Sequence, residues 1–226
     1  GSMLKLEETL TLRIEGNGPI GKIIVDADAH GHIRAYASNP HCHFEYNDGR
    51  LNAKATIGDK GFINVIRDLK LKEPFIGSTP IINGELAEDF AYYFMVSEQV
   101  PSAVSLGVLV NTDAEAVVSG GLIVQVLPNT PEETIIQLEK RLQILPTMSE
   151  MLSSGLDLEQ IIFNVADDAR ILETIPVEYH CNCSKDKFSR GILSLGYDEV
   201  KEMIDDEDEQ VETICHFCGE KYYFSK

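Results

Sequence analysis

Regular alternation of apolar and polar residues marks the first half of the chain. In residues 9–15 every second position is apolar and the positions between are threonine, arginine or glutamate, which is the pattern of a half-buried strand. Comparable strand patterns recur at residues 20–26, 32–38, 61–68, 103–110 and 116–127. Residues 86–97 carry aromatic residues at helical spacing behind an acidic first turn and predict a helix. We therefore expect a large, mostly antiparallel sheet domain over residues 1–130.

The periodicity changes near residue 128. A helix beginning at Pro131 carries an apolar stripe and is ended by Pro146. The stripe consists of Ile135, Leu138, Leu142 and Leu145. A capping box at Asp157 predicts a second helix, and residues 169–174 predict a third. Because helices this short are marginal in isolation, we interpret residues 131–176 as a helical linker that packs on its neighbours.

Four of the five cysteines lie in the last quarter of the chain as two close pairs. Cys181 and Cys183 form a C-x-C motif, and Cys215 and Cys218 form a C-x-x-C motif after 31 intervening residues. Two such pairs brought together place four thiolates at the corners of a tetrahedron, the geometry of a structural Zn²⁺ site. Residues 177–226, which also include a helix pattern at 201–208, are too few for a good apolar core, so zinc is the expected staple. The alternative is two unrelated buried pairs or ordinary structural disulfides.

The C-x-C motif suggests that the same sulfurs have a second state. An ordinary zinc ribbon uses C-x-x-C twice. If the metal leaves, a disulfide within C-x-C closes a very small ring, and strained disulfides are the easily reduced, regulatory kind. Zinc keeps the sulfurs as thiolates, which is the form that an oxidant attacks. Because metal binding supplies folding free energy, loss of zinc is expected to unfold this segment.

The residues around the cysteines resemble a known family. The stretches C-N-C-S-x-x-K-F and C-H-F-C-G-E-K-Y are similar to those of the redox-regulated chaperone family called the 33 kDa chaperonin, or heat-shock protein 33. The likeness extends upstream to residues 18–21, 84–86, 97–102 and 120–125, and so covers nearly the whole chain. Members of that family carry a substantial stretch ahead of the match. We therefore expect the chain to be cut at its front, with some strands ending beside a gap, and its tail to be shortened after Lys226.

The resemblance supports an α+β fold with three parts. These are a core chaperone domain at residues 1–130, a helical linker at 131–176 and a zinc-binding redox-switch domain at 177–226. The function that it implies is an ATP-independent holdase, inactive when reduced and zinc-bound and activated by oxidation. No catalytic residue and no enzymatic activity are expected.

The resemblance also implies how the switch works. In the family, oxidation forms disulfides within each close pair, which here would join Cys181 to Cys183 and Cys215 to Cys218. Zinc then leaves and the linker unfolds. The exposed apolar surface would bind unfolding client proteins, and the active form would be a homodimer in the cytoplasm.

Charge narrows the range of partners. Lys and Arg total 19 against 37 Asp and Glu, and the formal net charge of −18 disfavours nucleic-acid phosphate. A zinc-ribbon module that binds nucleic acid is the main alternative for the cysteine-bearing segment. Residues 176–226 contain six Lys and Arg against twelve Asp and Glu, a balance of 6 − 12 = −6 that argues against it. The sequence has no run of about eighteen apolar residues, so no membrane span is predicted, and cysteines at metal spacing suit a reducing cytosol.

Two further patterns invite a chemical interpretation. A C-x-x-C motif can serve a disulfide reductase, but such a motif usually opens a helix, whereas a glycine and an aromatic strand pattern follow here. His41 and His43 would point to one face of a strand and Cys42 to the other, so the three are not expected to share a metal ion. His180 and His216 flank the cysteines and could tune the thiolates.

Overall fold

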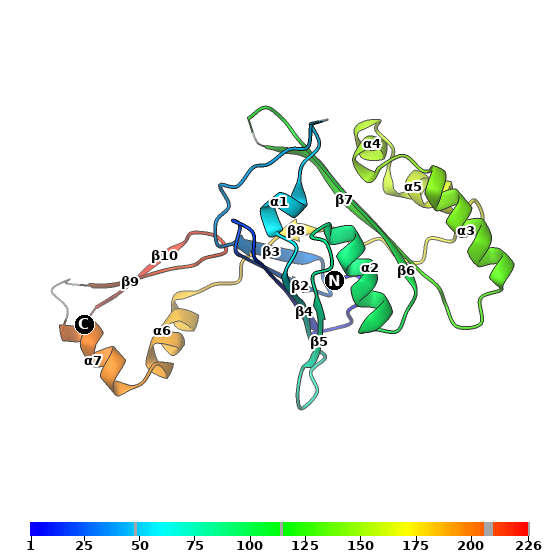
Figure 1. Cartoon of the computed structure of the whole chain (residues 1–226). Coiled ribbons are helices and arrows are strands. Elements are labelled where there is room, and N and C mark those ends of the chain that lie inside the picture. Colours follow the sequence, from blue (N-terminus) through cyan, green and yellow to red (C-terminus); the bar gives the residue numbers. More distant parts are fainter. Residues whose placement is uncertain (48, 114, 206–209, 226) are drawn as a thin grey trace.

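The centre of the molecule is a six-stranded sheet in the order β5-β4-β1-β2-β3-β8 (Figure 1). The computed structural model describes residues 1–47, 49–113, 115–205 and 210–225. The strands are β1 (Thr9–Gly16), β2 (Lys22–Asp28), β3 (His32–Ala37), β4 (Gly61–Asp68), β5 (Phe75–Pro80) and β8 (Glu178–Tyr179). Neighbouring strands run antiparallel, except that β3 and β8 are parallel. The expected α+β class with a mostly antiparallel sheet is confirmed.

One face of this sheet carries the main core. Two helices pack on it, α1 (Ala53–Ile57) and α2 (Leu86–Val96). The buried residues of the cluster come from the strands and from both helices, namely Ile14, Ile57, Ile63, Val65, Ile81 and Tyr93. Ile14 lies on the apolar face of the alternating stretch at residues 9–15, and Leu10 and Leu12 of the same face pack against the cluster, so contact with the core follows the period of two that the sequence shows.

A separate hairpin supports the linker helices. β6 (Ser102–Val110) pairs antiparallel with β7 (Ala116–Gln125) in a sheet of its own. The helices that follow are α3 (Glu132–Ile144), α4 (Met148–Ser153) and α5 (Leu158–Val165), and they gather beside this hairpin (Figure 1). Both α4 and α5 begin with a capping box, at Thr147 and Asp157.

Buried methionines fasten the linker helices to the hairpin. Met148, Met151 and Ile161 are each at most 2% exposed and pack with Leu122 of β7. Glycine permits this close approach, because a Cβ on Gly107 would lie 2.5 Å from the backbone nitrogen of the residue after Met148. The linker therefore packs on its neighbours, as expected, and the neighbour is the β6–β7 hairpin.

The cysteine-bearing segment lies on the other side of the central sheet from the linker helices (Figure 1). After β8 it consists of α6 (Lys185–Ser194), α7 (Tyr197–Asp205), β9 (Gln210–Ile214) and β10 (Lys221–Ser225). Strands β9 and β10 form an antiparallel hairpin. None of the helices in the described part of the chain has the length and apolar character of a membrane span.

The strands and the helix predicted within residues 1–130 are present, with ends within two residues of those expected. The patterns did not specify α1, β5 or β8. The helix predicted at 169–174 is wrong, because those residues form no regular structure and Leu172 is 85% exposed, without the packing that a short helix needs. The helix expected at 201–208 is α7, which begins at Tyr197, and residues 206–208 lie outside the described residues.

Candidate metal centre

The two cysteine pairs lie on two separate segments that meet. Cys181 and Cys183 lie between β8 and α6, while Cys215 and Cys218 lie on the turn that joins β9 to β10. In that turn the backbone N–H of Gly219 donates to the carbonyl of Cys215 at 2.7 Å. Gly219 has a φ of 75°, a left-handed conformation that favours glycine. The chain therefore reverses directly behind the last sulfur.

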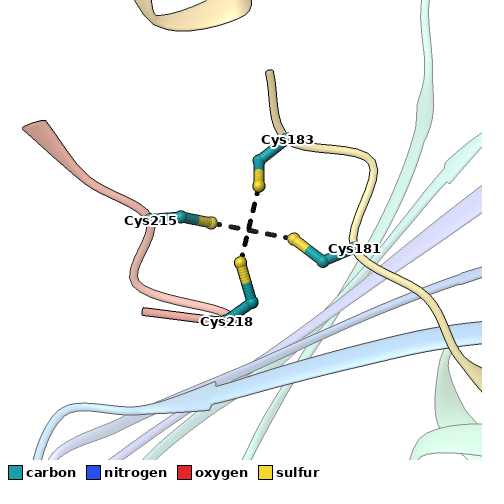
Figure 2. A group of neighbouring side chains, drawn as sticks. All are labelled: Cys181, Cys183, Cys215 and Cys218. Atoms are coloured by element: carbon teal, nitrogen blue, oxygen red, sulfur yellow. Dashed lines mark hydrogen bonds between the residues drawn. The ribbon is translucent and has the colours of Figure 1, made fainter. Parts of the chain in front are cut away.

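The four sulfurs form a compact cluster in which the side chains converge from both segments (Figure 2). All four Sγ atoms lie within 4.8 Å of one another. The Sγ atoms of Cys181 and Cys215 are 3.7 Å apart, and those of Cys183 and Cys218 are 3.4 Å apart. With Zn–S bonds of about 2.3 Å, the edge of a regular tetrahedron measures about 3.8 Å. The arrangement can therefore hold one metal ion between four sulfurs.

The cluster favours some thiolates over others. Burial opposes ionisation of Cys181, but hydrogen bonds from the backbone of Cys183, from neighbouring thiols and from Arg34 lower its pKa to about 7. At Cys218 a backbone hydrogen bond from Glu220 favours the thiolate, but the adjacent thiol groups outweigh it and raise the pKa to about 12. One charged sulfur thus makes ionisation of the next unfavourable. A bound cation removes this conflict by stabilising all four thiolates together.

Arg34 of β3 joins the cluster to the central sheet. Its Nε and Nη2 donate to one carboxylate oxygen of Asp26 at 2.8 and 2.7 Å. Its Nη1 donates to the Asn182 side-chain oxygen at 3.0 Å and lies 3.8 Å from Sγ of Cys181. The guanidinium carbon also lies 4.2 Å from the centre of the Phe217 ring. One side chain of the sheet therefore contacts both of the stretches that supply the cysteine pairs.

Aromatic residues extend this junction. The ring of Tyr36 on β3 packs 5.2 Å from that of His216, and the hydroxyl of Tyr179 donates to the carbonyl of Phe217. His180 stacks on His32 with ring centroids 4.5 Å apart. The two histidines that flank the cysteines thus contact the sheet. Sequence patterns could not reveal the sheet partners of these histidines, because His180 lies 180 − 32 = 148 residues from His32 and His216 lies 216 − 36 = 180 residues from Tyr36.

The cysteine-bearing segment has little apolar core of its own. In its described part, Cys215 is the only buried residue, at 4% exposed. Helices α6 and α7 bury no side chain. Within the segment, the Phe188 and Tyr222 rings lie 5.1 Å apart beside the sulfurs, and the Tyr222 hydroxyl is 3.1 Å from Sγ of Cys183. Coordination of a metal is thus the strongest candidate for what holds this segment together.

The histidine and cysteine motif at residues 41–43 lies outside the four-cysteine cluster. Residues 41–43 are not part of a strand, and His43 lies 2.8 Å from Oε1 of Glu45. Cys42 is half-buried and free. Among the described residues, the groups whose ligand atoms converge are the four cysteines and a second set that includes His180.

Comparisons with known proteins agree with this centre. A family profile described as Hsp33 protein matches residues 1–225. The 33 kDa chaperonin of Bacillus velezensis is 49% identical over 228 residues, which span all of this chain and 78% of that protein. The 33 kDa chaperonin of Bacillus cereus is 47% identical over 229 residues, with the same two coverages.

A solved structure agrees as well. The crystal structure of the 33 kDa chaperonin, a heat shock protein 33 homologue, from Thermotoga maritima superposes with a TM-score of 0.88 at 34% sequence identity. The match covers 99% of this chain and 77% of that one. Identity of nearly one half along the whole chain, together with this superposition, establishes what the cysteine motifs suggested. The chain belongs to the Hsp33 family, whose members are chaperones and not enzymes.

Proposed function

We propose that this protein is a redox-regulated, ATP-independent holdase that protects unfolding client proteins from aggregation. The proposal rests on the four-sulfur cluster in a segment with almost no buried side chain besides Cys215. Such a segment depends on its metal for structure, and its metal depends on reduced sulfur. The chemical state of four side chains can therefore decide whether the segment is folded.

Zinc is the ion that we assign to the reduced form, with Cys181, Cys183, Cys215 and Cys218 as its ligands. A tetrahedral set of four sulfurs favours zinc or an iron–sulfur cluster. Sulfur separations of 3.4 and 3.7 Å are close to the edge expected around one zinc ion. Free thiols of this kind persist in a reducing compartment, so we place the protein in the cytoplasm.

Oxidation would remove the ligands in pairs. Following the family likeness, we assign the disulfides to Cys181 with Cys183 and to Cys215 with Cys218. Each disulfide forms when two thiolates give two electrons to hydrogen peroxide, which takes up two protons and becomes two waters. The short contacts in the reduced structure join the two segments instead, at 3.7 and 3.4 Å. All four sulfurs lie within 4.8 Å of one another, so pairing within each motif is also within reach, and it replaces the contacts between the two segments with a bond inside each of them.

Loss of the ion would unfold residues 177–226 first. Structural zinc contributes on the order of 10 kcal/mol at neutral pH, and a whole domain is stable by only about 5–15 kcal/mol. Disulfides that close loops of a few residues restore little of this. The segment beyond β8 therefore has no alternative source of comparable stability among its described contacts.

Unfolding would then loosen residues 131–176 and expose apolar surface. The linker helices are short, and the chain leaving them leads to β8 and the first cysteine. Once that end is free, the packing of Met148 and Ile161 on Leu122 is the main remaining restraint. Release of the helices would expose these side chains and the hairpin beneath them, which is the kind of surface that binds unfolding clients. Two such surfaces can cover each other, so we expect the oxidised form to be a homodimer.

Zinc content and client protection, measured on the same samples before and after peroxide, test the proposal. At the four cysteines we expect one zinc per chain in the reduced protein and none after oxidation. Suppression of client aggregation should rise, without ATP, as zinc is lost from the cysteines. Peptide mapping should find disulfides within each motif. The variant Cys42→Ser is the matched control and should behave like the unmodified chain.

Equal protection of clients by the reduced and oxidised forms would contradict the switch. Retention of zinc at the four cysteines after complete thiol oxidation would contradict the ligand assignment. Binding of nucleic acid in a low-salt filter assay, without client protection, would instead favour a zinc-ribbon module.

A further inference from the structure

A second set of metal-ligating side chains lies where β8 joins the central sheet. His32 of β3 is the register partner of Glu178 in the parallel pair β3–β8. His180 continues the line of β8, because its backbone N–H donates to the Ile33 carbonyl at 2.9 Å. Glu178 and His180 are two residues apart on this extended chain and so share one face. One ligand atom from each of the three residues lies within 4.8 Å of the other two.

His32 is oriented as a metal ligand would be. Its Nδ1 lies 2.8 Å from Oδ2 of Asp28. The same carboxylate accepts backbone hydrogen bonds from His30 at 2.8 Å and from His32 at 3.2 Å, which fix its position. A carboxylate on one ring nitrogen of a histidine holds the proton there and leaves the other nitrogen free to bind a metal. In His32 this leaves Nε2 as the ligand atom.

Nε2 of His32 points towards a second electron-pair donor. Oε1 of Glu178 lies 3.4 Å from it. With metal–nitrogen and metal–oxygen bonds of about 2.1 Å, the edge of a tetrahedron is about 3.4 Å. The two atoms are therefore already at the separation that one bound ion requires, and a cation between them would satisfy both lone pairs.

The surroundings complete the site. The His180 ring stacks on the His32 ring at 4.5 Å, which brings a third ligand to the same place. An open pocket of about 260 Å³ adjoins the two histidines and leaves room for water on the ion. Its walls include Asp26, Asp28 and Arg34, and the charge of Arg34 is balanced by its ion pair with Asp26, which leaves the carboxylate of Asp28 beside His32. The charge facing the ligands thus favours a cation.

We propose that His32, Glu178 and His180 bind a second divalent transition-metal ion, with water as the fourth ligand. Two imidazoles and one carboxylate form a ligand set that zinc accepts in proteins. The ligands come from the core sheet on one side and from the strand that leads to Cys181 on the other. The ion would therefore clamp the start of the cysteine-bearing segment to the sheet.

This second metal site, the clamp, would not respond to oxidation as the four thiolates do. Neither imidazole nor carboxylate has a sulfur to lose to a disulfide, so the second ion would stay bound when the cysteines are oxidised. If the proposed switch is correct, an occupied clamp keeps residues 178–180 on the sheet while the rest of residues 177–226 unfolds, and it restrains release of the linker. The metal site itself does not depend on that switch.

Zinc titration of the reduced chain, residues 1–226, tests the site. We expect two zinc equivalents for the unmodified protein and one for His32→Ala and for Glu178→Gln. Asp28→Asn, which removes only the support of the ring, should weaken the second equivalent about 10–100-fold. With cobalt as the probe, the second equivalent should add no sulfur-to-metal charge-transfer absorption, which separates it from the four-cysteine centre.

His30→Ala is the matched control. His30 is an exposed histidine whose ring centroid lies 6.0 Å from that of His32, and it should keep both equivalents. Glu178 is exposed and its replacement by glutamine keeps its shape, so an unchanged circular dichroism spectrum and an intact first equivalent would exclude misfolding. A single equivalent in the unmodified chain overturns the proposal. So does a second equivalent that survives both His32→Ala and Glu178→Gln, or one lost equally in His30→Ala.

Discussion

The linker helices and the cysteine-bearing segment are both built from short elements, yet different forces hold them. The linker has a small apolar core, in which Met148, Met151 and Ile161 are at most 2% exposed. In the described part of the cysteine-bearing segment, only Cys215 is buried. An oxidant reaches the thiolates of the cluster readily, whereas the methionine sulfurs of the linker core are shielded from it by burial. The two regions should therefore differ in their response to oxidation, which acts on the cysteine-bearing segment first.

The largest expected effect is loss of the metal centre. Cys215→Ser removes the buried ligand, and residues 177–226 should lose hydrogen-exchange protection throughout, because zinc supplies on the order of 10 kcal/mol there. The linker should lose only part of its protection, since its contacts with β7 remain. Cys42→Ser, which replaces a cysteine outside the cluster, should change neither region. Persistent protection of residues 210–225 in Cys215→Ser would show that zinc is not the staple.

The reciprocal substitution weakens the apolar core of the linker and leaves the cysteines unchanged. Met148→Ala should cost about 2–5 kcal/mol of the free energy that holds the linker on the hairpin, because it opens a cavity at a site 1% exposed. We expect client protection without oxidation while zinc remains bound. Ile144→Ala, at a position 82% exposed, is the control and should leave the reduced form inactive. Full protection of residues 148–165 in Met148→Ala would refute the importance of this core.

A smaller effect is expected from crowding the hairpin surface. At Gly107 a methyl group would lie 2.5 Å from a backbone nitrogen of α4, so Gly107→Ala should push the helix away at a cost of about 1–3 kcal/mol. At Gly121 the nearest atom is the end of the Leu106 side chain at 2.8 Å, which can move aside. Hydrogen exchange of α4 should therefore rise in Gly107→Ala and much less in Gly121→Ala. Equal responses would mean that α4 does not rest on Gly107.

A substitution at Arg34 tests the junction between the central sheet and the cysteine-bearing segment. Arg34→Lys keeps the charge but loses the planar fork that contacts Asp26, Asn182 and Phe217 together. We expect zinc to stay bound. Hydrogen exchange should increase only at residues 178–180, by an amount that corresponds to a loss of about 1–2 kcal/mol in the free energy of docking on the sheet. Arg190→Lys, at an exposed position of α6, should have no such effect. Loss of zinc from Arg34→Lys would show that docking and metal binding are inseparable.

The smallest expected effect is the dependence of linker stability on acidic pH. Hydrogen bonds from the side chain and backbone of Thr147 hold the pKa of Glu150 below its usual value. A lowered folded-state pKa means that this contribution to stability is present above the unfolded pKa of about 4.3 and is lost as pH falls below it. Protection factors at the start of α4, which allow for the slower intrinsic exchange in acid, should therefore fall as the pH drops below about 4.3. In Glu150→Gln this pH dependence should disappear, and an unchanged dependence would exclude the capping box as its cause.

Much of the architecture could be predicted from the order of residues alone. Alternation at residues 9–15 specified β1 because a strand with one buried face must repeat every two residues. The C-x-C and C-x-x-C motifs specified the sulfur cluster because closely spaced ligands can reach one ion with little choice of backbone path. The capping boxes at Thr147 and Asp157 are likewise local, and the Asp157 box was visible in sequence.

Long-range pairing was decided only in the folded chain. The sequence does not show that Glu178 lies beside His32, that Arg34 reaches Cys181, or that Met148 rests against Gly107. Each of these contacts joins segments whose own patterns are satisfied by many other partners. Two-residue strand β8 has too few positions for any period to appear, and its place is fixed by hydrogen bonds to β3. Local chemistry thus determined which residues can bind metal, and the tertiary structure decided which parts of the molecule that metal would hold together.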